Sequence, residues 1–317
     1  MTPIRLLGLD IGGTSSRARV VADGIVEAEA RAASASLTAA GPDSATAALG
    51  ELLAQLPAGE PFDAVCAGSA GSNVPGAREF LADRLAPLTR TGTVIVVNDA
   101  ALVLPAAGLD EGVAVICGTG SIAVGTWQGR EARSGGFGYL LGDEGSGYWI
   151  TRAAVRALLD RRDRGVPLGV LGEVLLTAAS AGHIDELHRM FYDHPHPRRW
   201  ARHAPLVLDA DDPAARSITV EAAQAMAALA TSAMRRLARP AGLEAVPPAG
   251  HPGALPVVLG GGLMGHPRLR DAAVIATGGA LPGSEVRALT EPPVAGAVRL
   301  AGAAAQRDWQ PGAPASS

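Results

Sequence analysis

The stretch Leu6 to Val20 reads Leu-Leu-Gly-Leu-Asp-Ile-Gly-Gly-Thr-Ser-Ser-Arg-Ala-Arg-Val, and the first part of the fold is organised around it. Its apolar start is typical of a buried strand, and Asp10 places a carboxylate where the strand meets a turn. A buried carboxylate needs a partner, because an unpaired buried charge is costly. Gly12 and Gly13 allow backbone N–H groups to approach phosphate oxygens closely, and Thr14 adds a hydroxyl group.

The same stretch is also typical of a β-hairpin. A Gly-Gly pair between two apolar runs favours a tight turn, after which the segment from Arg17 to Val21 pairs back on the first strand. The hairpin and the phosphate site are compatible with each other. Short glycine motifs also occur by chance, so a second motif is needed to favour the phosphate site.

Length and composition indicate a two-lobed chain without a membrane span. The 317 residues suit two lobes of ordinary size, and 48% apolar residues are enough to form their cores. No run approaches the roughly 18 uninterrupted apolar residues of a membrane span, and Asp10 precedes any apolar region of a secretion signal. We therefore expect a cytoplasmic protein. The net charge of −4 without a basic tract argues against nucleic acid or anionic membrane as partner.

The basic residues are unusual, because all 27 are arginine and none is lysine. This excludes a P-loop lysine, a protein-kinase strand lysine and Schiff-base chemistry. Any phosphate must therefore be bound by backbone N–H groups, by arginine or by a metal ion. Cys66 and Cys117 each lie in an apolar, strand-like segment, so we expect two buried, reduced thiols and no disulfide.

Strand-like and helical segments alternate through much of the chain, which predicts an α/β protein with a parallel or mixed sheet. Strands are expected at 24–31, 63–68, 94–97, 113–117, 122–127 and 257–259, and helices at 42–56, 75–88 and 294–307. Residues 151–240 are expected to be mainly helical, with breaks near Gly165, Gly182, 195–197 and 209–213. Met226, Met234 and Leu237 are expected in the core, 241–256 as a surface loop, and 308–317 as a frayed tail.

Asp99 follows the strand expected at 94–97. In open α/β sheets, ligands gather at the carboxyl ends of strands, so Asp99 is placed where chemistry is usually done. The alternative is that Asp99 only caps the helix that follows it. The sequence leaves the two roles open.

A second turn repeats the plan of the first one. The strand expected at 113–117 is followed by Gly118-Thr119-Gly120-Ser121 and then by a returning strand. Two units of strand, glycine-hydroxyl turn and strand indicate a duplicated architecture, whose two turns are expected to face each other across a cleft.

The block Gly135 to Ile150 is the most distinctive part of the sequence. Its Gly-Gly-Phe-Gly start lets the backbone approach a ligand, and Asp143 precedes a helix. A carboxylate at a helix start is favoured by the helix dipole, which is one interpretation of Asp143. The other is a sugar-binding carboxylate, because carboxylates accept paired hydroxyl hydrogen bonds well.

Two further features leave alternatives open. The triple glycine at 260–262 follows an apolar strand, and it allows either a flat ring such as adenine or simply a tight strand-to-helix turn. The five histidines between 183 and 203 do not have the spacing of a zinc motif, so no metal site is expected there.

Taken in order, five of these motifs resemble the N-acetylglucosamine kinase family, within the superfamily of sugar kinases, actin and heat-shock ATPases. The motifs are Asp10-Ile-Gly-Gly-Thr14, Asn98-Asp99-Ala-Ala, Gly118-Thr-Gly-Ser121, the block 135–150 and Leu259-Gly-Gly-Gly262. The resemblance implies two ribonuclease H-like lobes, with ATP and a hexosamine in the cleft between them. We expect an N-terminal lobe over 1–112, to which the helix at 294–307 returns, and a C-terminal lobe over 113–293 with a helical insertion.

The resemblance also implies a role for each matching residue. Asp99 would be the general base that accepts the proton of the sugar 6-hydroxyl, and Asp10 would hold Mg²⁺ through water. The phosphates of ATP would lie on Gly12, Gly13, Thr14, Gly118, Thr119, Gly120 and Ser121, with Gly260 and Gly261 near adenosine. The sugar would contact Asp99, Gly136, Phe137, Asp143 and Ser36.

Two positions depart from the family pattern. Ser36 stands where family members usually carry an asparagine, and Ile122 stands where some relatives have a polar residue near the acetamido group. The sequence therefore leaves N-acetylglucosamine, glucosamine and N-acetylmuramic acid open as alternative substrates. We expect a homodimer. The alternatives to a kinase are an activator ATPase with a cysteine-ligated iron-sulfur cluster and a non-catalytic sugar sensor that binds ATP.

Overall fold

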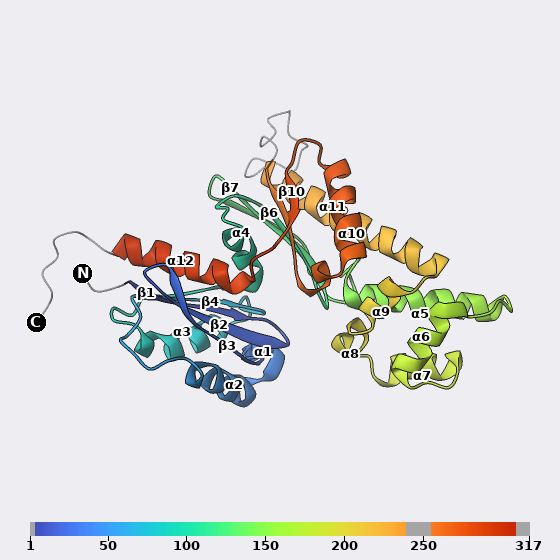
Figure 1. Cartoon of the computed structure of the whole chain (residues 1–317), viewed down its shortest axis with the longest axis horizontal. Helices are drawn as coiled ribbons and strands as arrows, with labels where there is room; N and C mark the ends of the chain where they lie inside the picture. Colours follow the sequence, from blue (N-terminus) through green and yellow to red (C-terminus); the bar gives the residue numbers. More distant parts are fainter. Residues whose placement is uncertain (1–3, 239–254, 309–317) are drawn as a thin grey trace, which may run out of the picture. The chain divides into compact units, whose positions relative to one another are not determined.

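The computed structural model describes residues 4–238 and 255–308. The chain forms two compact units. The N-terminal unit comprises Met1–Asp110 together with Thr290–Ser317, and the C-terminal unit comprises Glu111–Leu289. Each unit contains a five-stranded sheet with its own helices (Figure 1).

The N-terminal sheet has the strand order β3-β2-β1-β4-β5. Its strands are β1 (Arg5–Ile11), β2 (Ser15–Ala22), β3 (Ile25–Ala33), β4 (Ala64–Ser69) and β5 (Val94–Asn98). β1, β2 and β3 form an antiparallel meander, whereas β4 is parallel to β1 and β5 is parallel to β4. The ladder from Arg5↔Ala22 to Ile11↔Ser16 confirms the expected hairpin around Gly12 and Gly13.

Helices cover both faces of the N-terminal sheet (Figure 1). They are α1 (Leu37–Ala40), α2 (Pro42–Ala54), α3 (Ala77–Leu85), η1 (Ala86–Leu88), η2 (Asp99–Leu102), α4 (Val103–Ala106) and α12 (Pro293–Asp308). One face packs leucines of α2 and α3 against alternate residues of β1 and β4. On the other face, α12 lies so close to β1 that a Cβ atom on Gly8 would be 2.7 Å from the Val298 backbone nitrogen. The helix expected at 294–307 therefore belongs to the N-terminal unit.

The C-terminal sheet repeats the strand order of the N-terminal sheet. Its strands are β6 (Gly112–Cys117), β7 (Ser121–Trp127), β8 (Arg130–Gly135), β9 (Val257–Gly260) and β10 (Val286–Ala288), in the order β10-β9-β6-β7-β8. Again three antiparallel strands are followed by two parallel ones. The predicted fold class, α/β with two ribonuclease H-like units, is confirmed. The sequence patterns did not identify β8 or β10, because Ala132 is the only apolar side chain of β8 and β10 has only three residues.

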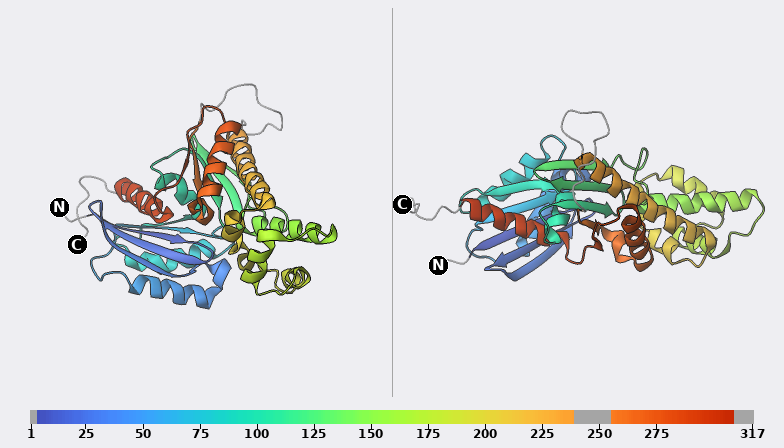
Figure 2. Two further views of the ribbon diagram at one scale, coloured as in Figure 1. Left: turned by 45° about the vertical axis from the view of Figure 1, so that its right-hand side comes forward. Right: turned by 90° about the horizontal axis from the view of Figure 1, so that it is seen from above.

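Residues 151–238 are mainly helical, as predicted, and the breaks fall where they were expected, except that the break at 202–203 was not predicted. The helices of the C-terminal unit are α5 (Gly147–Asp163), α6 (Gly169–Ala179), α7 (Ile184–Asp193), α8 (Pro197–Ala201), α9 (Ala204–Asp209), α10 (Pro213–Ala238), η3 (Gly262–Gly265) and α11 (Pro267–Ala280). α10 and α11 run side by side against the C-terminal sheet (Figure 2). Met226, Met234 and Leu237 of α10 are buried in the core, as expected.

Both cysteines are buried and free, which confirms the prediction. Burial raises the pKa of each thiol to about 12, so neither forms a thiolate near neutral pH. No helix within 4–238 or 255–308 combines the length and apolar character needed to cross a membrane. The loop expected at 241–256 lies mostly outside the described residues, and so does nearly all of the tail expected at 308–317.

Candidate functional site

Two carboxylates lie at the carboxyl edge of the N-terminal sheet. Asp10 is the next-to-last residue of β1, and Asp99 follows β5 directly. β4 lies between these two strands. Burial raises the pKa of Asp10 to about 6; the Asp99 charge adds to this, and Arg17 opposes it. Burial also raises the pKa of Asp99, while the Ala100 backbone N–H opposes the shift. The two carboxylates are thus close enough to influence each other's charge.

Asn98 and Asp99 both accept a hydrogen bond at the start of η2. Asn98 is the N-cap of η2, and its Oδ1 accepts a hydrogen bond from the Ala100 N–H at 3.2 Å. Asp99 Oδ1 accepts from the same N–H at 3.0 Å. Because Asn98 already caps the helix, this position does not need a second capping carboxylate.

The first glycine turn is held by hydrogen bonds at Gly12, whereas the N–H groups of Gly13 and Thr14 are not used within the turn. The Gly12 N–H donates to the Ser15 carbonyl oxygen at 3.0 Å, and Ser34 Oγ donates to the Gly12 carbonyl oxygen at 2.7 Å. Within the described residues, the N–H groups of Gly13 and Thr14 donate no hydrogen bond. A rigid turn with two available N–H groups is suited to binding an anion.

The second glycine turn has the same character. The Gly118 N–H donates to the Gly120 carbonyl oxygen at 2.9 Å, and the Gly147 N–H, at the start of α5, donates to the Gly118 carbonyl oxygen at 2.8 Å. In the part of the chain that the structure describes, the N–H groups of Thr119 and Gly120 have no acceptor. Ser121 differs from these residues, because its hydroxyl group is buried and donates to the Glu144 carbonyl oxygen at 2.7 Å. Its side chain therefore holds the turn and is not presented to a ligand.

The triple glycine packs beside the strand that leads into this second turn. Gly261 has a φ of +95°, and a Cβ atom there would lie 2.3 Å from the Cys117 carbonyl oxygen. Only glycine fits such a close approach of two backbones. Gly260 ends β9 opposite Ile116 of β6. The fold thus brings Gly260 and Gly261 next to the second turn, although they lie far from it in the sequence.

Asp143 also belongs to the surroundings of the second turn. Its Oδ1 accepts a hydrogen bond from the Ser121 N–H at 3.3 Å, and a Cβ atom on Gly120 would be 2.7 Å from its Oδ2. Burial raises the pKa of Asp143, and the Ser121 N–H opposes this shift. α5 is capped by Ser146, whose Oγ accepts from the Trp149 N–H at 3.2 Å, so Asp143 does not cap that helix.

The remaining predicted sugar contacts are placed differently from one another. The Gly136 N–H donates to the Ser121 carbonyl oxygen at 3.0 Å, which ties the glycine-rich block to β7. Phe137 is 70% exposed. Ser36, in the N-terminal unit, is fully buried, and its Oγ donates to the Ala70 carbonyl oxygen at 2.8 Å. The structure therefore does not present the Ser36 hydroxyl to a ligand.

Three site neighbours were missed by the sequence patterns. Arg17 pairs directly with Asp10 across the hairpin, a position that counting outward from the Gly12-Gly13 turn would have revealed. Ser34 supports the first turn, and Arg133 Nη2 donates to the Gly136 carbonyl oxygen at 2.7 Å. Neither contact has a sequence signal, because each depends on how strands and loops converge in three dimensions.

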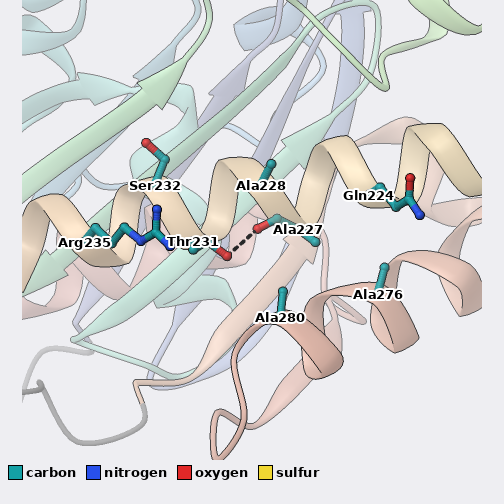
Figure 3. Close-up of a pocket in the computed structure, with 8 residues that line it drawn as sticks. All are labelled: Gln224, Ala227, Ala228, Thr231, Ser232, Arg235, Ala276 and Ala280. Carbon is teal, nitrogen blue, oxygen red and sulfur yellow. Dashed lines mark hydrogen bonds between the residues drawn. The ribbon is translucent and has the colours of Figure 1, made fainter.

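A groove on the C-terminal unit lies away from these residues, between α10 and α11 (Figure 3). Figure 3 shows Ala276 and Ala280 of α11 below α10, on which Thr231 Oγ1 donates to the Ala227 carbonyl oxygen at 2.8 Å. The lining residues are Gln224, Ala227, Ala228, Thr231, Ser232, Arg235, Ala276 and Ala280. None of them is a predicted site residue.

No group of three or more His, Cys, Asp or Glu side chains in the described ranges is arranged to hold a metal ion. Magnesium in phosphoryl-transfer enzymes usually keeps several waters and binds one or two carboxylates together with substrate phosphates. Asp10, with Asp99 beside it, has the oxygen chemistry that such an ion prefers.

Comparison with known families identifies the group to which the sequence belongs. Residues 7–304 match the BadF/BadG/BcrA/BcrD ATPase family. The chain is a member of this family. The match covers nearly the whole sequence, including both glycine turns, the block 135–150 and α12.

Two curated relatives are similar to part of the chain. The chain is 40% identical over 136 residues to the N-acetylmuramic acid/N-acetylglucosamine kinase of Clostridium acetobutylicum, covering 42% of this chain and 44% of that protein. It is 38% identical over 122 residues to the N-acetyl-D-glucosamine kinase of Dictyostelium discoideum, covering 36% and 38%. The aligned stretches thus span less than half the length of both curated relatives.

A solved structure matches over a longer range. It is a protein from Chromobacterium violaceum that is provisionally described as an N-acetylglucosamine kinase. The TM-score is 0.72 at 27% identity, and the match covers 93% of this chain and 98% of the other. The two ribonuclease H-like units are therefore shared along almost the full length of both chains.

Proposed function

We propose that the protein is an ATP-dependent amino-sugar kinase that phosphorylates the 6-hydroxyl group of a hexosamine, foremost N-acetylglucosamine. The observation that carries the proposal is the pair Asp10 and Asp99, two partly buried carboxylates with raised pKa values at the carboxyl edge of one sheet. Membership of an ATPase family and the amino-sugar kinases among its relatives support it.

Asp99 is the proposed general base. It would accept the proton of the 6-hydroxyl group as the sugar oxygen attacks the γ-phosphorus of ATP. A carboxylate with a raised pKa is a stronger proton acceptor than an ordinary one, and the raised pKa of Asp99 therefore supports this role.

Asp10 is the proposed magnesium residue, acting through a bound water. Bound Mg²⁺ would supply positive charge to the phosphate oxygens during transfer. Asp10 forms no ion pair with Arg17 within the described residues, although the arginine charge favours its ionised form. Its oxygens thus remain available to water in the first shell of an ion.

The two glycine turns are the proposed phosphate cradle. The four N–H groups of Gly13, Thr14, Thr119 and Gly120 have no acceptor in the described structure. Phosphoryl transfer asks mainly for positioning and charge neutralisation. Backbone N–H groups and a metal ion supply both in a chain without lysine.

Each of the two units would provide different residues of the proposed site. The N-terminal unit, proposed as a lobe over 1–112 with the helix at 294–307, provides the base, the magnesium residue and the first turn. The lobe over 113–293 provides the second turn, the adenosine contacts Gly260 and Gly261, and the sugar contacts Gly136, Phe137 and Asp143. The expected homodimer and the cytoplasmic location stay predictions.

The activator-type alternative is disfavoured by the cysteines. Cys66 and Cys117 are each fully buried inside a sheet, and burial raises the pKa of both thiols to about 12. Cluster ligation requires accessible thiolates.

The test is a phosphotransfer assay with ATP and Mg²⁺ against glucosamine, N-acetylglucosamine, N-acetylmuramic acid, N-acetylmannosamine and glucose. We expect ADP formation to be stimulated by an amino sugar, and phosphorus–proton correlation NMR to place the new phosphate on O6. Chelation of Mg²⁺ should abolish turnover. ATP binding without stimulation by any sugar would instead favour the sensor.

A further inference from the structure

Arg133 is an exposed cation beside the proposed sugar contacts. It lies on β8, two residues before Gly135, where the chain turns into the glycine-rich block. Its Nη2 donates a hydrogen bond to the Gly136 carbonyl oxygen at 2.7 Å. The hydrogen bond fixes the position of the guanidinium group next to one of the proposed sugar contacts.

A continuous series of hydrogen bonds connects Arg133 with Asp143. The Gly136 N–H donates to the Ser121 carbonyl oxygen, and the Ser121 N–H donates to Asp143 Oδ1. The guanidinium group and the Asp143 carboxylate therefore flank the same short piece of backbone, on either side of Ser121 and Gly136. A ligand that contacts Gly136 therefore lies beside Arg133, whose Nη2 is 2.7 Å from the Gly136 carbonyl oxygen.

Ile122 lies beside the guanidinium group. A Cβ atom built on Gly136 would be 2.8 Å from Arg133 Nη2 and 2.8 Å from Ile122 Cδ1. An apolar methyl group and a cation thus converge on Gly136. Both side chains come from the antiparallel pair of β7 and β8, which makes their juxtaposition a rigid feature of the sheet.

Most of the hydrogen-bonding capacity of Arg133 is unused. A guanidinium group carries five N–H donors, and the contact to Gly136 occupies one of them. Arg133 forms no ion pair with any acidic side chain in the ranges 4–238 and 255–308. The planar fork of an arginine matches a carboxylate in a bidentate pair, which makes a carboxylate the natural partner for the free donors.

Resting on the proposed amino-sugar kinase function, we propose that Arg133 and Ile122 form a specificity site for an amino sugar that carries a carboxyalkyl substituent. Ile122 contacts the alkyl part of the substituent, and Arg133 binds its carboxylate. A neutral amino sugar makes neither contact. The pair thus determines substrate preference and takes no part in the transfer itself.

The test measures kcat and KM for N-acetylmuramic acid, which has such a substituent, and for N-acetylglucosamine, which lacks it. Arg133→Gln should lower the ratio of the two kcat/KM values, acidic over neutral sugar, about tenfold. The change should lie in KM for the acidic sugar. Arg133→Lys should recover part of the ratio because it keeps the charge. Added salt should raise KM for the acidic sugar in the wild type but not in Arg133→Gln, since an exposed ion pair is screened.

Arg130→Gln is the matched control, because it removes the same charge from the far end of β8, opposite Trp127. It should leave both sugars unaffected. An equal loss for both sugars in Arg133→Gln would assign Arg133 a structural role and overturn the inference. Phosphorylation of N-acetylglucosamine but not of N-acetylmuramic acid by the wild type would also overturn it, while the proposed function stands. Phosphorylation of no amino sugar would overturn both.

Discussion

Asp10 of the N-terminal unit and Ile116 of the C-terminal unit occupy equivalent places. Each lies two residues before the first glycine of its turn, on the central strand of a sheet with the same strand order. Asp10 pairs with Arg17 across its hairpin, whereas Ile116 pairs with Ile122. The same backbone plan thus presents ionisable groups in one unit and apolar groups in the other.

The parallel strands of the two sheets also end differently. β5, two strands from β1, is followed by Asp99, whereas β9, which pairs with β6, ends at Gly260 and is followed by Gly261. The N-terminal sheet carries carboxylates at its carboxyl edge. The C-terminal sheet carries glycines there, which let two backbone segments pack closely together. The comparison teaches that the shared topology fixes where a ligand can contact each unit, while the residues at the strand ends decide what chemistry occurs there.

The largest effect is expected from removing the proposed base. Asp99→Asn should lower kcat roughly 10²- to 10⁴-fold, because it removes proton transfer while keeping the size of the side chain. ATP binding and the melting temperature should change little, since Asn98 caps η2. Steady-state kinetics with N-acetylglucosamine measures the loss.

The control for Asp99→Asn is Asp110→Asn, an exposed carboxylate of the same unit. Wild-type kcat should fall as the pH drops through the raised pKa of Asp99, and so at a higher pH than for an ordinary aspartate. If Asp99→Asn turned over as fast as the wild type, the proposal that the N-terminal unit provides the general base would be wrong.

A glycine substitution sharpens the comparison in the C-terminal unit. Gly261→Ala should lower the free energy of unfolding by about 2–3 kcal/mol, because the residue has a φ of +95° and its Cβ would collide with the Cys117 backbone. Denaturant unfolding followed by circular dichroism measures the change.

Gly262→Ala is the matched control, since a Cβ atom there meets nothing within 4 Å. It should be tolerated with a much smaller loss of stability. If the two variants were equally stable, the close packing of the triple glycine on β6 would not be required by the fold.

A substitution of Asp143 tests whether this carboxylate of the C-terminal unit contacts the sugar or ATP. Asp143→Ala should raise KM for the sugar about tenfold and leave KM for ATP much less changed, because charge-assisted hydrogen bonds to hydroxyl groups are lost. Glu144→Ala removes the exposed neighbouring carboxylate and serves as control. An equal rise for both substrates would point to a role in holding the second turn through Ser121.

The smallest effect concerns stability and pH in the N-terminal unit. The pKa of Asp10 rises from 3.8 to about 6 on folding, so the folded chain binds the proton more tightly than the unfolded chain. The free energy of unfolding should therefore fall as pH rises from about 4 to about 6. Asp10→Asn should remove this loss and stabilise the metal-free protein at pH 7.5 by about 1–2 kcal/mol.

Urea unfolding at pH 4 and pH 7.5 measures this difference, with Asp83→Asn on the exposed side of α3 as control. The stabilised Asp10→Asn variant should at the same time lose activity, as expected where a functional carboxylate is buried at a cost. A pH-independent difference between Asp10→Asn and wild type would contradict the burial of this charge.

Much of the fold could be predicted from local patterns. The apolar runs around Leu7, Val65 and Val115 identified buried strands, and the glycine turns identified the hairpins that follow β1 and β6. β8 and β10 were missed because their residues do not alternate or extend far enough to give a periodic signal. Their assignment depends on neighbours in the sheet.

The candidate site was predictable only in part. Asp10, Asp99 and the glycine turns are visible as motifs because the chemistry needs those residue types next to a strand end. The burial of Ser36 and of the Ser121 hydroxyl has no local signal, since both depend on backbone carbonyl groups from remote segments. The contact of Arg133 with Gly136 is equally invisible in the sequence.

The sequence by itself determined the alternation of strands and helices, the absence of lysine chemistry, and the two glycine turns. These follow from local periodicity and from residue identity, which act over a few positions. Only the tertiary structure decided that the Ser36 hydroxyl is buried, that Gly261 packs on Cys117, and that Asp10 and Asp99 share one sheet edge. The raised pKa values depend on that placement, because desolvation and charge–charge interaction arise only when distant segments are packed together.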